Sequence, residues 1–124
     1  MPYEIAPDQD KRLVVIRISG DVTLAEVRGI VADLLGRVEV SGFRQLVDLR
    51  ELNSATAISA ADIRAIAAGA MSASPMRAVV ASDSATFGLA RMFAALRNLK
   101  DSGDQIGVFR TMREAEDWLG LSAV

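Results

Sequence analysis

The chain contains 124 residues and carries a formal net charge of −2, with neither cysteine nor histidine. Because those two residue types are absent, it cannot assemble a disulfide, a thiolate nucleophile, a sulfur-ligated metal site or an imidazole-based catalytic triad. The charge balance also disfavours a nucleic-acid surface, which needs a basic stripe.

The composition favours one globular domain that spans residues 1–124. With 51% hydrophobic and 24% charged residues, the chain can form one good core and is too short for two. No apolar run approaches the roughly 18 residues of a membrane span, and Met1-Pro2-Tyr3-Glu4 lacks the basic and apolar regions of a signal peptide. We therefore expect a soluble, cytoplasmic protein.

The chain begins with two strand-like segments, residues 3–6 and 13–18, joined by turn-forming residues. This pattern predicts an antiparallel hairpin. Asp8 and Asp10 in the turn could bind a cation, but two carboxylates in a polar turn are most often simply solvated, and we expect no metal.

A first helix is predicted after Gly20. Thr23 and Glu26 have the spacing of a capping box, in which each side chain satisfies a backbone N–H group. Gly36 marks the decay of this helix. Its apolar face is expected to comprise Leu24, Val27, Ile30, Val31, Leu34, Leu35 and Val38.

The next unit is a strand within residues 43–52 followed by a second helix. Ser59 is the expected N-cap of that helix, with Asp62 at its third position. Ile58 can pack on Ile63 as a hydrophobic staple.

The stretch from Met76 to Leu99 predicts a buried strand at residues 78–81, a tight turn and a third helix. Phe87 falls on the opposite side of this helix from its largest apolar residues and aligns with Ala90 and Ala94. We expect the large residues to pack on the sheet, namely Leu89, Met92, Phe93, Leu96 and Leu99.

A last strand at residues 106–109 precedes a fourth helix, which begins with a Thr111–Glu114 capping box and stops at Gly120. Its inward residues should be Met112, Ala115, Trp118 and Leu119. Strands that alternate with four amphipathic helices predict an α/β fold, with a mostly parallel sheet of about five strands and an antiparallel hairpin at its edge.

This order of elements resembles the STAS-like group of bacterial domains, whose best known members are the anti-sigma-factor antagonists. A related sheet topology occurs in CRAL/TRIO lipid carriers. Residues 87–93 look like those of small stand-alone bacterial proteins of the group that remain functionally uncharacterised. The resemblance covers nearly the whole chain and rests on Gly20-Asp21-Val22-Thr23, Leu46-Val47-Asp48-Leu49, Phe109-Arg110, Glu114-Ala115 and Trp118-Leu119.

The resemblance implies a regulatory serine. In the antagonists, a serine at the start of the helix after the Asp-Leu strand is phosphorylated by a partner kinase, which controls docking to that kinase. The nearest match is Ser59, with Ser54 behind it. The Asp-Ser-Ser-Gly run of the family is replaced by Ala57-Ile58-Ser59-Ala60, and an N-cap is the alternative role of Ser59.

The carboxyl ends of the parallel strands should form a rim of polar residues where ligands bind in open α/β sheets. Such a rim could hold a small anion or a phosphoserine, whereas helix capping alone explains most of these residue types. Its expected members are Asn53, Ser54, Thr56, Ser59, Ser82, Asp83, Ser84, Thr86, Arg110 and Thr111.

Phe87 and its small neighbours could form an exposed surface for a partner or for a second copy of the chain, or line a lipid-like pocket. Alternatively, the ring folds under the preceding loop. Arg91 beside it suits an acidic partner residue, or is simply solvated.

These residues lead to three hypotheses. The first is a non-catalytic regulatory module that docks a protein across the rim and the Phe87 face. The second is a carrier or sensor of a small apolar or anionic ligand in a CRAL/TRIO-like pocket. The third is an enzyme with Asp83 as general base near Ser59 or Ser84. Because the chain has no phosphate-binding loop and no dinucleotide-binding glycine motif, we expect neither catalysis nor a cofactor.

Overall fold

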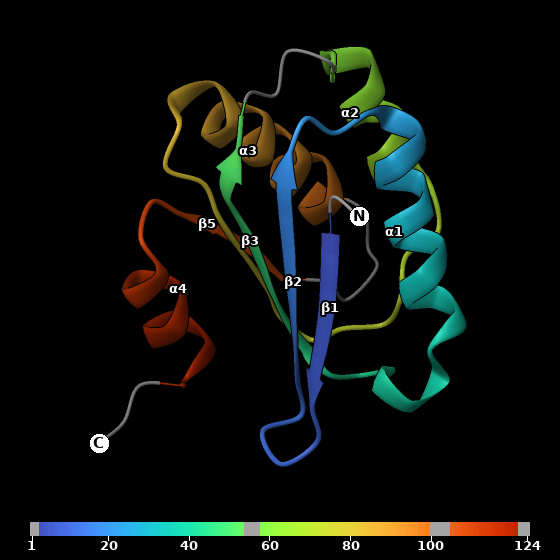
Figure 1. Cartoon of the computed structure of the whole chain (residues 1–124), viewed down its shortest axis with the longest axis vertical. Helices are drawn as coiled ribbons and strands as arrows, with labels where there is room; N and C mark the ends of the chain where they lie inside the picture. Colours follow the sequence, from blue (N-terminus) through green and yellow to red (C-terminus); the bar gives the residue numbers. More distant parts are fainter. Residues whose placement is uncertain (1–2, 54–57, 100–104, 122–124) are drawn as a thin grey trace.

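The computed structural model describes residues 3–53, 58–99 and 105–121. A five-stranded sheet in the order β1-β2-β3-β4-β5 forms its centre (Figure 1). The strands are β1 (Tyr3–Asp8), β2 (Leu13–Gly20), β3 (Arg44–Leu52), β4 (Arg77–Val80) and β5 (Ile106–Phe109). The helices are α1 (Leu24–Gly36), a short 3-10 turn η1 (Val38–Val40), α2 (Ala60–Ala68), α3 (Ser84–Leu99) and α4 (Met112–Leu119).

The strand directions confirm the predicted fold class. β1 pairs antiparallel with β2, and the pairs β2–β3, β3–β4 and β4–β5 are parallel. All four residues of β4 are buried, as predicted for an interior strand covered on both faces. Because β2 to β5 run in one direction, their carboxyl ends lie along one edge of the sheet, while the β1–β2 turn lies at the opposite end (Figure 1).

The helices divide between the two faces of the sheet. α1, α2 and α3 cover one face, and α4 covers part of the other (Figure 1). Under α4 the core contains Leu13, Leu46, Ala78, Val80, Ala115 and Leu119. Under the three other helices it contains Val14, Ile16, Ile18, Val22, Ile30, Leu34, Val40, Phe43, Ile58, Val79, Ala90, Ala94 and Ile106.

The predicted helix caps are confirmed. Thr23 and Glu26 form a complete capping box at α1, and Ser59 and Asp62 form one at α2. At α4, the Thr111 side chain accepts a hydrogen bond from the backbone N–H of Glu114. Gly120 ends α4 with φ of 77°, a left-handed conformation that glycine adopts at little cost.

The inward face of α1 is shorter than predicted. Ile30 and Leu34 are buried, but Leu35 is 44% exposed and Val38 is 80% exposed. The helix ends at Gly36, and Val38 belongs to the 3-10 turn that follows, so its position no longer obeys the helical spacing. The apolar stripe of α1 therefore stops one turn early.

The predicted inward face of α3 is wrong in its orientation. The residues that pack most deeply are Thr86, Ala90, Ala94 and Arg97, whereas Leu99 is 84% exposed. Small side chains allow a helix to approach a sheet closely, so the alanines occupy the contact line and the larger Leu89 and Phe93 lie beside it, half-buried. The exposed surface of Phe87, Ala90 and Ala94 that the sequence suggested therefore does not form, because both alanines are buried.

A buried polar network, which sequence reasoning missed, supports the chain between α2 and β4. The Gln45 side chain donates to Ser72 Oγ at 2.8 Å and accepts from Arg77 Nε at 2.9 Å. Arg77 also donates to the carbonyl of Ser72 and is only 2% exposed. Buried polar groups need such partners, so this network fixes an otherwise irregular segment.

Candidate functional site

The predicted rim residues lie where β4 and β5 end and where α2 and α3 begin. Ser82 and Asp83 follow β4, Ser84 opens α3, and Arg110 follows β5. Ser54 and Thr56, which belong to the predicted rim, lie outside the described residues. The rim therefore combines segments that are distant in sequence.

Arg110 joins these segments. Its guanidinium carbon lies 4.2 Å from the centre of the Phe87 ring, within the range of a cation–π contact. Its Nη1 atom lies 3.4 Å from the carbonyl oxygen of Ser82 and 3.5 Å from Ser84 Oγ. Phe87 is half-buried, while the arginine and both serines are exposed. We call Ser82, Ser84, Phe87 and Arg110 the Arg110 cluster.

Asp83, the candidate general base, caps α3 instead. Its carboxylate accepts hydrogen bonds from the Thr86 backbone N–H at 3.0 Å and from Thr86 Oγ1 at 3.1 Å. These bonds, with the nearby charge of Arg110, hold the pKa of Asp83 below its ordinary value. A carboxylate with a lowered pKa is a weak base, so this geometry does not favour proton abstraction near neutral pH.

The other predicted site residues lie on α2 and α3. Ser59 is exposed; its Oγ accepts from the Asp62 N–H at 3.1 Å, and the Asp62 carboxylate accepts from the Ser59 N–H at 3.0 Å. Arg91 lies exposed on α3, one helical turn beyond Phe87. Both side chains are accessible, as a docking surface or a modification site requires.

An apolar cavity of about 180 Å³, partly open to solvent, lies between the sheet and the three helices α1, α2 and α3. Sequence reasoning raised a pocket as an alternative but did not locate this one, since a volume left between elements has no sequence pattern. Residues that line it include Ile16, Val22, Val31, Val47, Ile66, Leu89, Ala90 and Phe93.

The polar groups of residues in the cavity wall form hydrogen bonds with protein partners and do not face the cavity. Gln45 and Arg77 bind each other, and the Thr86 hydroxyl binds Asp83. The cavity therefore presents carbon atoms almost throughout.

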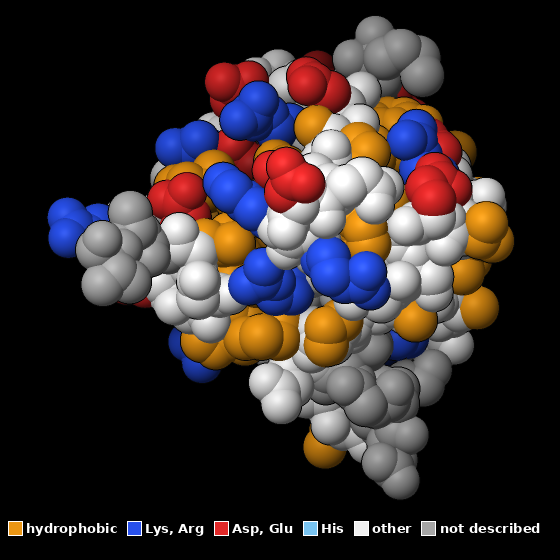
Figure 2. Space-filling model, turned by 90° about the horizontal axis from the view of Figure 1, so that it is seen from below, with side chains coloured by type: hydrophobic (Ala, Val, Ile, Leu, Met, Phe, Trp, Pro, Cys, Tyr) orange, Lys and Arg blue, Asp and Glu red, His pale blue; other side chains and the backbone are white. Residues whose placement is uncertain are grey.

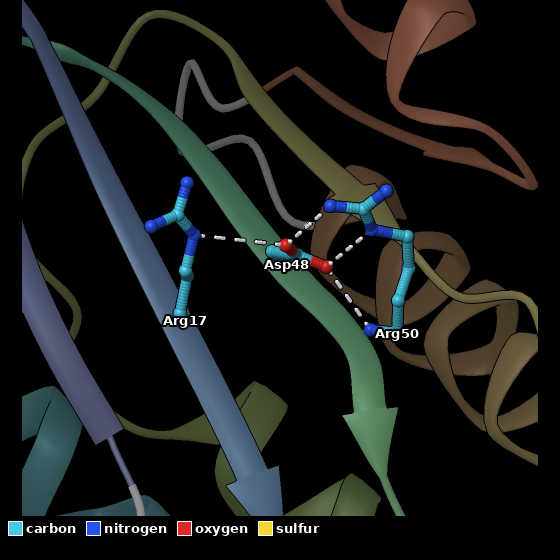
Figure 3. A network of polar contacts seen from close by, with 3 residues as sticks. All are labelled: Arg17, Asp48 and Arg50. Atoms are coloured by element: carbon cyan, nitrogen blue, oxygen red, sulfur yellow. Dashed lines mark hydrogen bonds and ion pairs between the residues drawn. The ribbon is translucent and has the colours of Figure 1, made fainter.

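On the other face of the sheet, Asp48 of β3 is held between two arginines (Figure 3). Its oxygens accept from Arg50 Nε at 2.9 Å and Arg50 Nη2 at 3.0 Å, and Arg17 Nε lies 3.8 Å away. Burial raises the pKa of Asp48, but the hydrogen bonds and charges of the arginines outweigh it, and the pKa is lowered overall. Both arginines are partly exposed, so this carboxylate serves to hold them on the sheet surface.

Two further properties concern the part of the chain that the structure describes. Within residues 3–53, 58–99 and 105–121, no three Asp or Glu side chains gather closely enough to hold a metal ion. None of the helices in these ranges is both long and apolar enough to cross a bilayer.

The fold is similar to that of known structures. No protein-family model matches the sequence, and no curated protein sequence matches it significantly. One similar structure is an uncharacterised protein of the DUF3478 family with a SpoIIAA-like fold from Shewanella loihica PV-4, with 18% identity, a TM-score of 0.58 and coverage of 94% of this chain and 91% of that one.

Another is an anti-sigma factor antagonist from Mycobacterium paratuberculosis, with 16% identity, a TM-score of 0.56 and coverage of 95% of this chain and 94% of that one. At these identities the comparison establishes the architecture alone. It agrees with the mixed five-stranded sheet and its four helices described above. The chain therefore has the STAS-like fold, also described as SpoIIAA-like, that its sequence motifs implied.

Proposed function

We propose that this chain is a non-catalytic regulatory module that docks a protein partner at the rim formed by Ser59, Ser82, Asp83, Ser84, Phe87, Arg91 and Arg110. The observation that carries the proposal is the Arg110 cluster. An arginine, an aromatic ring and two hydroxyl-bearing residues from two loops converge on an accessible edge. Arginine and aromatic side chains are the types most enriched at the energetic centres of protein interfaces.

The geometry of the Arg110 cluster favours a role in docking a partner over a role in stabilising the fold. Phe87 is half-buried and lies under a single exposed arginine. The arginine's polar contacts, at 3.4 and 3.5 Å, are long, so a partner carboxylate can compete for the guanidinium. A protein with the same fold is described as an anti-sigma factor antagonist, and a regulatory role for this chain is consistent with that neighbour.

Affinity capture from lysate of the native host tests the docking surface. We expect Arg110→Glu to lose a partner that the unmodified chain retains, because the substitution reverses the charge of the cluster. Arg113→Glu is the matched control, since Arg113 is an exposed arginine nearby on α4. Equal loss in both variants, or retention in both, would argue against the rim as the docking surface.

Ser59 is the proposed regulated position, with Ser54 as the alternative. A phosphoryl group on Ser59 would place negative charge at the N-terminus of α2, which the helix dipole favours, but beside the Asp62 carboxylate, which opposes it. Phosphorylation would therefore break the capping box and alter the rim. Intact-mass analysis of protein from its own host, with Ser59→Ala as the control, tests this role.

The apolar cavity supports a second candidate function, the carriage of a small apolar molecule. Apolar cavities of similar volume accept small apolar ligands such as benzene, and this cavity, although partly open to solvent, has an almost entirely apolar wall. Native mass spectrometry of freshly purified protein tests this candidate, because a carrier would retain its ligand. A mass equal to that of the polypeptide alone would count against it.

A further inference from the structure

The two edge strands of the sheet differ in the residues that they carry. An edge strand presents unpaired backbone N–H and C=O groups, to which a strand of another molecule can pair. β1 forms one edge and contains Glu4, Pro7 and Asp8. Charged side chains, and a proline without an N–H group, discourage such pairing. β5 forms the other edge, and its residues Ile106–Phe109 include neither a charge nor a proline.

Asn98 of α3 binds the outer edge of β5. The Ile106 N–H donates to Asn98 Oδ1 at 3.3 Å, and Asn98 Nδ2 donates to the Ile106 carbonyl oxygen at 3.4 Å. The asparagine side chain is an amide, and like a peptide group it offers both an acceptor and a donor. A residue in an antiparallel neighbouring strand exchanges the same two bonds with the residue opposite it. Asn98 therefore takes the place of a further strand beside Ile106.

The outward groups of β5 can be identified from its pairing with β4. Backbone N–H groups on the β4 side donate to the carbonyl of Gln105 at 2.8 Å and to that of Phe109 at 3.0 Å. Because successive carbonyl groups along a strand point in opposite directions, those of Ile106 and Val108 point away from β4. The outer edge of β5 thus has two residues, of which Asn98 covers Ile106.

We propose that Asn98 guards this edge, and that without its amide two copies of the chain pair through their β5 strands. A twofold axis between two copies places the strands antiparallel. With Ile106 of each copy opposite Val108 of the other, both outward residues exchange hydrogen bonds and the paired side chains carry no charge. The same arrangement of β1 would bring the acidic Glu4 and Asp8 of two copies together, which opposes it.

Asn98 has an advantage over a second copy in the competition for Ile106. Because it belongs to the same chain, its contact costs none of the translational and rotational freedom that association removes. Its two hydrogen bonds are long, yet both have to break before another strand can pair at Ile106. Removal of the amide therefore favours pairing of the two copies.

Asn98→Ala tests the guard, with analytical ultracentrifugation over a range of concentrations as the measurement. We expect the dissociation constant of the dimer to fall at least about tenfold, because two hydrogen bonds no longer have to break. Asn53→Ala is the matched control. Asn53 is exposed and makes a contact of similar length, 3.4 Å to Asp21, but it follows the interior strand β3. This control should associate as weakly as the unmodified chain.

Val108→Pro identifies the surface through which the copies pair. Proline removes an outward N–H, so adding Val108→Pro to Asn98→Ala should return self-association to that of the unmodified chain. A gain in association that Val108→Pro leaves in place would show pairing elsewhere and overturn the proposal. No gain in Asn98→Ala would overturn it as well.

Hydrogen exchange in the unmodified chain tests the guard without any substitution. The backbone N–H groups of Ile106 and Val108 point out from the same edge, and Asn98 binds the first. We expect the Ile106 N–H to exchange at least about tenfold more slowly than that of Val108. Equal exchange of the two would mean that Asn98 does not protect the edge.

Discussion

Each end of the sheet carries an arginine stacked on a phenylalanine ring, and the two pairs differ in what lies beneath the ring. At the amino end of the parallel strands, the Arg12 guanidinium lies 4.9 Å from the centre of the Phe43 ring, and Phe43 is 2% exposed within the core. At the carboxyl end, Arg110 lies 4.2 Å from the Phe87 ring, which is only half-buried. The same contact covers the core at one end and stands on an accessible surface at the other.

The hydrogen bonds beside the two arginine–phenylalanine contacts differ in the same way, being short at the amino end and long at the carboxyl end. At the amino end, Arg44 donates to the Leu119 carbonyl at 2.5 Å and to the Lys11 carbonyl at 2.6 Å, so it ties α4 to the β1–β2 turn. Figure 2 shows this end of the molecule, where basic side chains lie among apolar ones. At the carboxyl end, the contacts of Arg110 are long. The contacts at the amino end therefore stabilise the fold, whereas the polar groups at the rim remain accessible to a partner.

The largest expected effect is on stability at the two phenylalanines. Phe43→Ala should lower the free energy of unfolding by about 3 to 5 kcal/mol, because it removes a buried ring and leaves a cavity. Phe87→Ala should lower it by about 1 kcal/mol or less, because the ring is partly exposed. Chemical denaturation measures both. Losses of similar size would remove the distinction between the two ends.

A smaller difference is expected between the two arginines that make polar contacts. Arg44→Ala should cost about 1 to 3 kcal/mol, since two carbonyl groups lose a charged donor. Arg110→Ala should stay within about 0.5 kcal/mol of the unmodified chain, as is usual for an exposed side chain. Thermal melting of the two variants provides the measurement, and a greater loss for Arg110→Ala would reverse the assignment of roles.

The smallest effect concerns the dependence of stability on pH. The folded-state pKa of Asp48 lies below its ordinary value of 3.8, so its contribution to stability is complete above that value and is lost as the pH falls through the folded-state pKa. Asp48→Asn should therefore flatten the decline of stability below about pH 4. The pKa of Asp83 is lowered as well, but Asp83 is exposed, so Asp83→Asn, which preserves an N-cap residue, should flatten this decline much less. Urea titrations at a series of pH values separate the two variants.

The elements and caps could be predicted because their signals are local. Thr23 with Glu26 and Ser59 with Asp62 specify where two helices begin within four residues of sequence. The orientation of α3 could not be predicted in this way. The spacing of its large apolar residues, such as Leu89 and Phe93, predicted that they face the sheet. In the structure the small Ala90 and Ala94 face it, because they allow the helix to approach closely.

The rim could be predicted only in part. The rule that ligand sites lie at the carboxyl ends of parallel strands placed Ser82, Asp83 and Ser84 at one edge. The stacking of Arg110 on Phe87 depends on how the loop after β5 approaches α3, which no local pattern encodes. The cavity depends on how three helices pack against three strands of the sheet, and the sequence shows there only apolar residues that any core would contain.

The most direct test of the docking surface is site-specific photo-crosslinking in the native host. A photoreactive phenylalanine analogue replaces Phe87 in one variant, Arg91 in a second, and Leu99 in a control, since Leu99 lies on the same helix and is 84% exposed. The account predicts that positions 87 and 91 crosslink the same protein and that position 99 does not. A partner captured as strongly from position 99, or from neither 87 nor 91, would contradict docking at the rim.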